Sequence, residues 1–228
     1  MATPVPRVTA AQYAALRAWL LQYDPDAPKF LSWAQRQRGR PDTAEKLAAE
    51  IIWIILCAGR SAQAARTLER KIWGALRQQQ PVVTVFGYKA KARAIERAWQ
   101  ERQQDFEALQ AIPETEVANL LAWCKRLPFI GDDTQYQLAK NLGADVCKPD
   151  IWLCRLAGIP DKPRQPVHRR LTSCMALCQA LAEASGDSVA VVDSLLWLGC
   201  NKGVLQVAPD AGPISLMLSA TPRRRSIG

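Results

Sequence analysis

Apolar residues recur every three or four positions along most of the chain, which is the spacing of an amphipathic helix. In the segment 10–23, for example, Tyr13, Leu16 and Leu20 fall on one helical face. The same spacing predicts helices over 10–23, 30–36, 43–58, 62–78, 89–104, 114–126, 132–142, 151–157, 169–185 and 189–199. The helix over 43–58 is apolar on nearly all sides after Ile51, so we expect it to be central in its domain.

One segment, Pro81–Gly87, has the β-branched composition of a strand. The chain offers it no partner strand, so we interpret it as a linker or a short helix. We expect residues 1–7 to be loose and the tail after Pro209 to be weakly structured. These patterns predict an all-α fold.

The chain is basic, with 30 Lys and Arg against 21 Asp and Glu and a net charge of +9. A hydrophobic content of 49% excludes general disorder. The charge favours an anionic partner, with nucleic acid first and a membrane surface second. A basic protein with no such partner is the alternative. No apolar run is long enough to span a bilayer, the longest being Ile51–Gly59.

The seven cysteines do not indicate a disulfide framework or a metal site. Most of them lie among apolar helical residues, as reduced and buried thiols do in a cytosol. Cys174 and Cys178 are four residues apart, which is not a zinc or cluster spacing, and His168 is the single histidine. We therefore expect no metal. The N-terminus lacks a signal-peptide pattern, and we expect a cytoplasmic monomer, associated with the nucleoid if the protein is bacterial.

The most informative stretch runs from Leu127 to Ala157. It opens with the turn Leu-Pro-Phe-Ile-Gly, in which Pro128 blocks a continuous helix and Gly131 permits a backbone angle that other residues resist. Asp132 and Asp133 follow, where carboxylates are expected to cap the next helix. Asp150 comes 17 residues after Asp133 and opens a further helix.

This combination resembles the helix-hairpin-helix/Gly-Pro-Asp (HhH-GPD) superfamily of base-excision DNA glycosylases. Its hairpin reads Leu-Pro-Gly-Ile/Val-Gly, and its catalytic aspartate opens a helix at a similar distance. The resemblance implies two helical domains, a six-helix barrel over 43–149 and a second domain from 1–42 and 150–228. It also implies that Asp150 stands at the cleft between them.

The resemblance makes Asp150 the catalytic residue. Breaking an N-glycosidic bond builds positive charge on the sugar, which a nearby carboxylate stabilises while it orients or deprotonates the attacking water. The alternative is that Asp150 only caps its helix, and the two roles are compatible.

The hairpin is expected to hold a DNA phosphate through backbone N–H groups near Ile130, Gly131 and Asp133. Phe129 stands where the family usually has glycine. In the family a monovalent cation often bridges hairpin carbonyls to the phosphate. A second DNA contact is implied for the turn at Arg60, Ser61 and Gln63, which would enter the minor groove and fill the gap left by the extruded base; an ordinary solvent-facing turn is the alternative.

Lyase members of the family place a lysine where this chain has Asp133, so the resemblance favours a monofunctional enzyme that uses water. A glycosylase/lyase using another lysine and an inert DNA-binding protein are the alternatives.

The candidates for the base pocket are Trp152, Tyr136, Trp53 and Lys148, although helical aromatics are more often core residues. Alkylated purines are the first candidate substrates, oxidised guanine the second, and a phage- or host-specific modified base stays open. Some relatives hold an iron–sulfur cluster with four closely spaced cysteines, a pattern that this sequence lacks.

Overall fold

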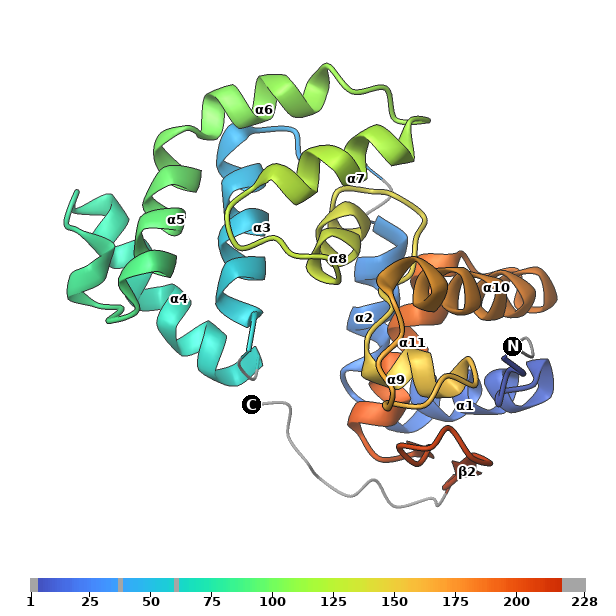
Figure 1. The fold of residues 1–228 in the computed structure, drawn as a ribbon. Helices are drawn as coiled ribbons and strands as arrows, with labels where there is room; N and C mark the ends of the chain where they lie inside the picture. The colour runs from blue at the N-terminus through green and yellow to red at the C-terminus, as the bar shows by residue number, and fades with distance from the viewer. Residues whose placement is uncertain (1–3, 37–38, 60–61, 219–228) are drawn as a thin grey trace. The chain divides into compact units, whose positions relative to one another are not determined.

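A computed structural model describes residues 4–36, 39–59 and 62–218, and its secondary structure is mostly helical (Figure 1). The all-α prediction is confirmed at this level. The helices are α1 Ala10–Tyr23, α2 Ala27–Arg36, α3 Ala44–Cys57, α4 Ala62–Arg77, α5 Lys89–Gln100, α6 Arg102–Gln110, α7 Val117–Arg126, α8 Thr134–Asn141, α9 Ile151–Leu156, α10 Val167–Ser185 and α11 Val189–Asn201. The segment predicted as one helix over 89–104 is instead α5 and the start of α6, which meet at Glu101.

The chain divides into two compact units. Gly39–Leu142 forms the middle unit, and the segments before and after it together form the outer unit. The observed boundaries lie slightly earlier in the chain than the expected 43 and 149. The reason at the second boundary is Gly143, whose φ of 97° ends α8 and begins the connection to the outer unit.

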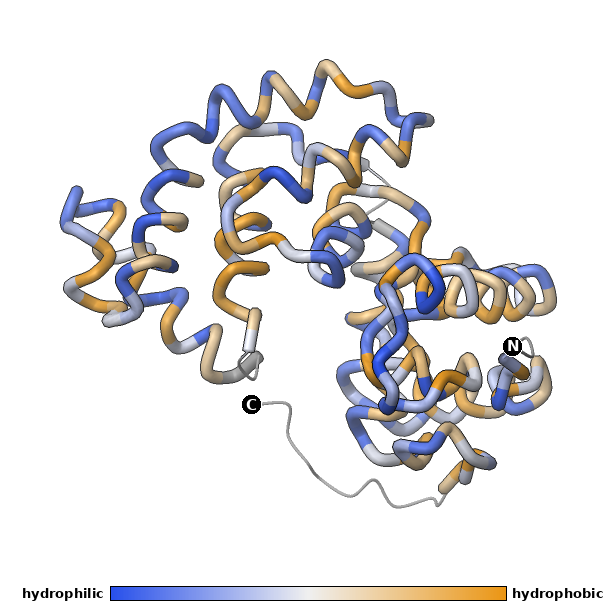
Figure 2. Tube along the Cα trace, in the orientation of Figure 1, coloured by the Kyte–Doolittle hydropathy of each residue, from blue (hydrophilic) through white to orange (hydrophobic). Residues whose placement is uncertain are grey.

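The middle unit is built around α3, which packs against α4, α5, α6 and α8. Its second half is apolar on all sides, and Ile51, Ile52 and Ile55 are each at most 1% exposed. Figure 2 shows the apolar character of α3 beside the more polar α5 and α6. The expectation that this helix is central in its unit is confirmed.

The outer unit is built around α11, which packs against α1, α2, α9 and α10. Ser188 caps its start by accepting a hydrogen bond from the amide of Val191. Gly199 brings α11 close to α1, because a Cβ at this position would lie 2.9 Å from a methyl carbon of Leu16. A side chain at residue 199 would therefore push the two helices apart.

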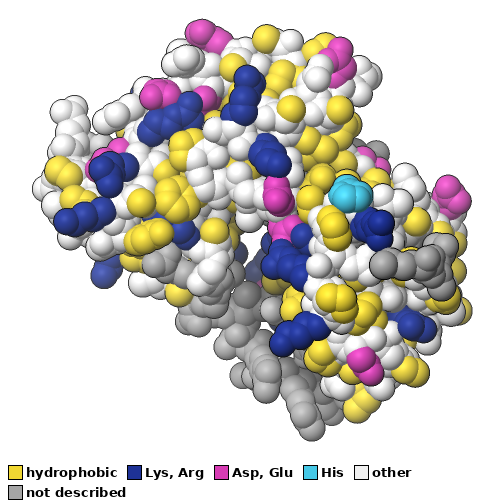
Figure 3. Space-filling model, viewed as in Figure 1, with side chains coloured by type: hydrophobic (Ala, Val, Ile, Leu, Met, Phe, Trp, Pro, Cys, Tyr) yellow, Lys and Arg dark blue, Asp and Glu magenta, His cyan; other side chains and the backbone are white. Residues whose placement is uncertain are grey.

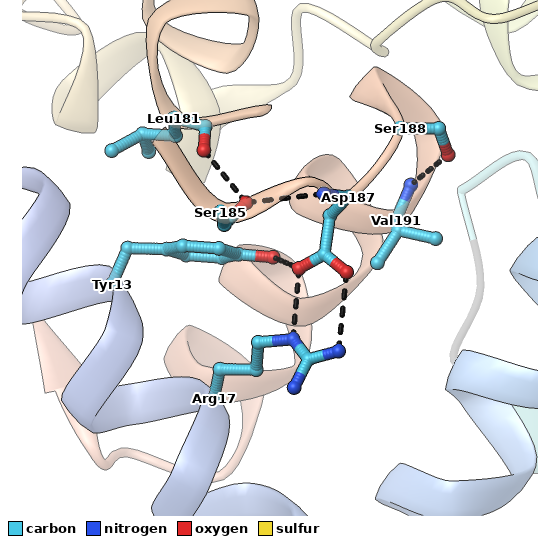
Figure 4. Close-up of polar contacts among 7 residues, drawn as sticks. All are labelled: Tyr13, Arg17, Leu181, Ser185, Asp187, Ser188 and Val191. Atoms are coloured by element: carbon cyan, nitrogen blue, oxygen red, sulfur yellow. Dashed lines mark hydrogen bonds and ion pairs between the residues drawn. The ribbon is translucent and has the colours of Figure 1, made fainter. Parts of the chain in front are cut away.

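A buried polar cluster joins α1 to the loop between α10 and α11 (Figure 4). The hydroxyl of Tyr13 donates to Oδ2 of Asp187 at 2.8 Å, and the Arg17 guanidinium donates to both carboxylate oxygens at 2.8 and 3.2 Å. The loop itself turns at Gly186, which has a φ of 74°. Residues far apart in the sequence are thus held together by one carboxylate.

Two expectations about the chain ends were wrong for the residues that the structure describes; residues 1–3 and 219–228 lie outside them. Residues 4–7 are not loose, because the amide of Arg7 donates to the Leu156 carbonyl at 2.8 Å and the backbone of Val5 packs on Gly158. Part of the chain after Pro209 is also structured, since β2 (Ser215–Leu216) pairs antiparallel with β1 (Leu205–Gln206). Each strand is too short to produce a recognisable alternating pattern.

The β-branched segment at 81–87 contains a short 3-10 helix, η1 (Val82–Thr84), as expected of a linker or short helix. Among the described residues, no helix has the length and hydropathy needed to cross a membrane.

Candidate functional site

The hairpin between α7 and α8 has its left-handed residue at a different position from the one expected. Phe129 has a φ of 63°, whereas Gly131 does not have a positive φ. A Cβ at residue 131 would meet only Thr134 Oγ1 at 3.9 Å, an ordinary contact distance. The expectation that Gly131 supplies the unusual backbone angle is therefore wrong; Phe129 supplies it.

Two of the hairpin amides expected to face a phosphate already have acceptors within the chain. The Ile130 amide donates to the Leu127 carbonyl at 3.1 Å, and the Gly131 amide donates to Thr134 Oγ1 at 2.7 Å. The Gly131 carbonyl accepts from both the Gln135 amide and Thr134 Oγ1. Both lone pairs of this oxygen are thus used within the chain, and the monovalent cation expected at the hairpin stays a prediction.

Of the two acids predicted to cap α8, Asp133 occupies the N-cap position, but its side chain makes no capping hydrogen bond. Asp132 forms an ion pair with Lys125 Nζ at 2.7 Å, and this pair raises the pKa of Lys125. The Asp132 charge beside the hairpin is thus matched by a cation from α7.

The turn after α3 is anchored by a buried lysine. Lys91 Nζ donates to the carbonyls of Ile55 at 2.9 Å and Ala58 at 2.6 Å, which satisfies the end of the helix. Arg60 and Ser61, predicted to enter the minor groove, lie outside the described residues. Gln63 lies in the first turn of α4.

Asp150 is the N-cap of α9. Its Oδ1 accepts hydrogen bonds from the amides of Trp152 and Leu153, both at 3.0 Å. Its own amide donates to the Lys148 carbonyl at 2.7 Å, so the backbone turns tightly just before it. The carboxylate is half-buried and its position is set by the helix that follows.

Two buried side chains from distant helices hold the segment before Asp150. Arg170 of α10 donates to the carbonyls of Pro149 at 2.6 Å and Gln165 at 3.1 Å. Asp193 of α11 accepts the Lys148 amide at 3.2 Å. Sequence reasoning missed both residues. An acid within the apolar run Val189–Asn201 was a visible signal for Asp193, whereas nothing local marked Arg170.

Buried thiols lie behind the same segment. Cys154 Sγ lies 3.9 Å from Cys174 Sγ and 3.4 Å from the Pro149 carbonyl. The hydrogen bond with Cys174 lowers the pKa of Cys154, and the same bond raises the pKa of Cys174. The seven cysteines form no disulfide; Cys57 is partly exposed and the other six are buried. Among the described residues, no group of three or more His, Cys, Asp or Glu side chains is arranged to hold a metal ion.

The candidate base-pocket residues have different environments. Trp152 is half-buried, and the Arg155 guanidinium lies 5.0 Å from its ring. Trp53 is also half-buried, with the Arg66 guanidinium 5.8 Å from its ring. Both rings thus retain partial exposure beside a cation.

Tyr136 and Lys148 differ from the tryptophans. Tyr136 is only 8% exposed, which places it with the core of the middle unit. Lys148 is half-buried and belongs to the turn before Asp150. The outer unit therefore brings Lys148, Asp150 and Trp152 together, and the middle unit holds Tyr136 and the hairpin.

No family model, curated protein or solved structure matches this chain.

Proposed function

We propose that this protein is a monofunctional DNA glycosylase that hydrolyses the N-glycosidic bond of a damaged or modified base. The observation that carries the proposal is the setting of Asp150. Its carboxylate is fixed by two amides of α9, and the backbone before it is held by Arg170 and Asp193. A charge held this firmly stabilises an oxocarbenium-like sugar without reorganisation during the reaction.

The roles of the neighbouring groups follow from their positions. Asp150 faces the developing positive charge and orients a water molecule for attack on the sugar. Trp152, two residues further along, offers an aromatic surface for an extruded base. The hairpin and the turn after α3 bind the duplex, with Phe129, Ile130, Gly131 and Asp133 on the first and Arg60, Ser61 and Gln63 on the second.

We propose that the enzyme acts as a monomer on double-stranded DNA in the cytoplasm. Alkylated purines are the first candidates and oxidised guanine the second. The net charge of +9 supports an electrostatic contribution to this binding.

The proposed reaction needs no lysine nucleophile. Asp133 stands at the family's lysine position and cannot form a Schiff base. The product should therefore be an intact strand with an abasic site, which breaks only after alkali or an abasic endonuclease is added.

The test is a base-release screen under single-turnover conditions, using one duplex sequence that carries each lesion in turn. Release of one base class, alkali-dependent strand breaks and no borohydride-trapped complex are the expected results. A trapped complex that is lost on replacing Lys148 or Lys140 would identify a lyase instead. Binding to the duplexes without base release from any of them would indicate an inert DNA-binding protein.

A further inference from the structure

Two aromatic rings are exposed together beside the hairpin of the middle unit. Phe129 is 39% exposed and Tyr88, just before α5, is 51% exposed. Their ring centroids lie 6.1 Å apart with an interplanar angle of 70°, an edge-on contact. The two residues come from separate parts of the sequence and form one small apolar surface.

The backbone of Phe129 is strained, and this strain is not offset by burial of its side chain. A φ of 63° is unfavourable for a residue with a Cβ, whereas glycine adopts it without cost. The ring remains substantially exposed, so it contributes little to the core of its unit. A strained residue with an exposed side chain points to a role outside the fold.

Cations flank the pair. Lys89 follows Tyr88, and Lys125 and Arg126 precede the hairpin turn; all three side chains are exposed, and Lys125 is paired with Asp132. Figure 3 shows Lys and Arg side chains, together with some Asp and Glu, interspersed with hydrophobic ones on the face of this unit that is turned toward the viewer. Alternating cations and aromatic rings match a ligand that offers both phosphates and an apolar surface, as nucleic acid does.

The start of α5 also connects the hairpin to the turn after α3. Tyr88 contacts Phe129 of the hairpin, and Lys91, three residues later, is bonded to the last carbonyls of α3. The two segments proposed to bind DNA are thus fixed to the same turn of helix, with the aromatic pair at the hairpin side of it.

We propose that Tyr88 and Phe129 contact the deoxyribose and base edges of the duplex held by the hairpin, and so supply a non-ionic part of DNA binding. This inference rests on the proposed DNA-binding function. Cations next to the rings neutralise phosphates, while the rings cover the apolar surface of the adjoining sugars.

The test replaces Phe129 with glycine, which removes the ring and relieves the strained backbone. Phe129→Gly should bind duplex DNA roughly tenfold more weakly at one salt concentration, in line with the loss of an aromatic–nucleic acid contact. Glycine gives the unfolded chain more backbone freedom, which by itself lowers the melting temperature slightly. The melting temperature of the variant should fall by no more than this small amount. The slope of log affinity against log salt should stay unchanged, because no phosphate contact is lost.

Matched variants isolate the ring as the cause. Tyr88→Ala should weaken binding and Tyr88→Phe should not, while Phe129→Trp should retain the wild-type affinity. Val83→Ala is the control, because Val83 lies in the same unit and is also 39% exposed, but is not aromatic.

The outcomes separate this inference from the proposed function. If the wild type binds duplex DNA with a steep salt dependence and Phe129→Gly binds it equally well, the role of the aromatic pair is overturned. The proposed DNA-binding function is then unaffected. A change in the salt slope of that variant would also overturn the role of the aromatic pair, because the residue would then act on phosphate contacts. Absence of duplex binding by the wild type would instead contradict the proposed function. Binding of the wild type, but not the variant, to anionic phosphatidylserine vesicles, with DNA affinity unchanged, would assign the pair to a membrane surface and overturn the proposal.

Discussion

The hairpin turn and the turn before Asp150 are built in opposite ways. The hairpin at Leu127–Gly131 is closed by hydrogen bonds between near neighbours and by a surface ion pair. The turn at Lys148–Asp150 is held by Arg170 and Asp193, which lie on two helices later in the chain. The hairpin is thus a local structure with an exposed ring, whereas the position of Asp150 depends on the core of its unit.

This difference predicts how the two regions respond to mutation. Side chains of the hairpin can change with little effect on stability, so their variants report on binding. Replacing the residues around Asp150 changes both the position of its carboxylate and the stability of the outer unit. Only a replacement of Asp150 that keeps its hydrogen bonds to the start of α9 therefore reports on chemistry. Four further predictions follow this contrast, from the largest expected effect to the smallest.

Asp150→Asn should reduce base release by roughly a thousandfold, because it removes the charge that faces the transition state. Asparagine is an equally good N-cap, so its carbonyl oxygen can keep the hydrogen bonds to the amides of Trp152 and Leu153. Single-turnover rates on the duplex identified in the screen provide the measurement. Circular dichroism and duplex affinity should be unchanged.

If Asp150→Asn is slow but has also lost its duplex affinity or its fold, that loss explains the slow rate. The result would then not support catalysis by the Asp150 carboxylate. A variant with near wild-type rates would show that Asp150 only caps α9, and the contrast between the two turns would then concern stability alone.

Arg170→Ala should destabilise the outer unit by about 3 kcal/mol, because it leaves the buried carbonyl of Pro149 and the part-buried carbonyl of Gln165 without their donor. Arg169→Ala is the matched control, since Arg169 is the exposed neighbour on the same helix. Urea unfolding measures both variants. An equal loss of unfolding free energy in the two variants would mean that the hydrogen bonds from Arg170 to Pro149 and Gln165 contribute no stability of their own.

Tyr13→Phe should cost about 2 kcal/mol at neutral pH, because it removes a part-buried hydrogen bond to the carboxylate of Asp187. Burial, followed by the hydrogen bond to Asp187, raises the pKa of Tyr13. Folding therefore favours the protonated phenol, and its contribution is complete below the ordinary tyrosine pKa of about 10 and declines above it.

The difference in unfolding free energy between wild type and Tyr13→Phe should consequently narrow as the pH rises above about 10. Urea titrations at pH 7, 9 and 10.5 measure this trend. If the difference in unfolding free energy between wild type and Tyr13→Phe stays constant across the three pH values, the pKa of Tyr13 is not raised by folding.

Glu50→Gln should slightly stabilise the middle unit at neutral pH. Burial is the main cause that raises the pKa of Glu50, Glu69 adds to it, and a hydrogen bond from Asn141 opposes it. The charged form is thus disfavoured by folding, and glutamine can still accept from Asn141. Thermal unfolding should show the gain at pH 7 and no difference below the ordinary glutamate pKa of about 4.3.

Glu107→Gln serves as the control, because Glu107 is exposed on α6 of the same unit. A gain of the same size in both variants would attribute the effect to the net charge of the protein instead of the environment of Glu50.

Sequence predicted the features that depend on near neighbours. Helical spacing identified α3 as central in its unit, and Gly143 ends α8 as expected. The apolar positions after Asp150 placed it at a helix start, where it caps α9. These features depend on periodicity, turn chemistry and helix capping, all of which act within a few residues.

The features that sequence reasoning did not predict are ones that local sequence patterns do not determine. A family pattern with two glycines does not say which hairpin residue adopts the left-handed conformation, and here it is Phe129. The break at Glu101 has no proline or glycine to mark it, so α5 and α6 read as one helix. Arg170 and Asp193 act over long sequence separations, which no local pattern encodes.

The division of the chain also sets an order of assembly during synthesis. The middle unit, over Gly39–Leu142, is synthesised before α9, so the helices that pack on α3 all precede Asp150 in the chain. The outer unit forms later, because α1 packs against α10 and α11, which are made after α9. Asp150 therefore gains its supports only after residue 193 has been synthesised, and a nascent chain stopped before that residue contains the whole hairpin but lacks the Asp193 support of the Asp150 segment.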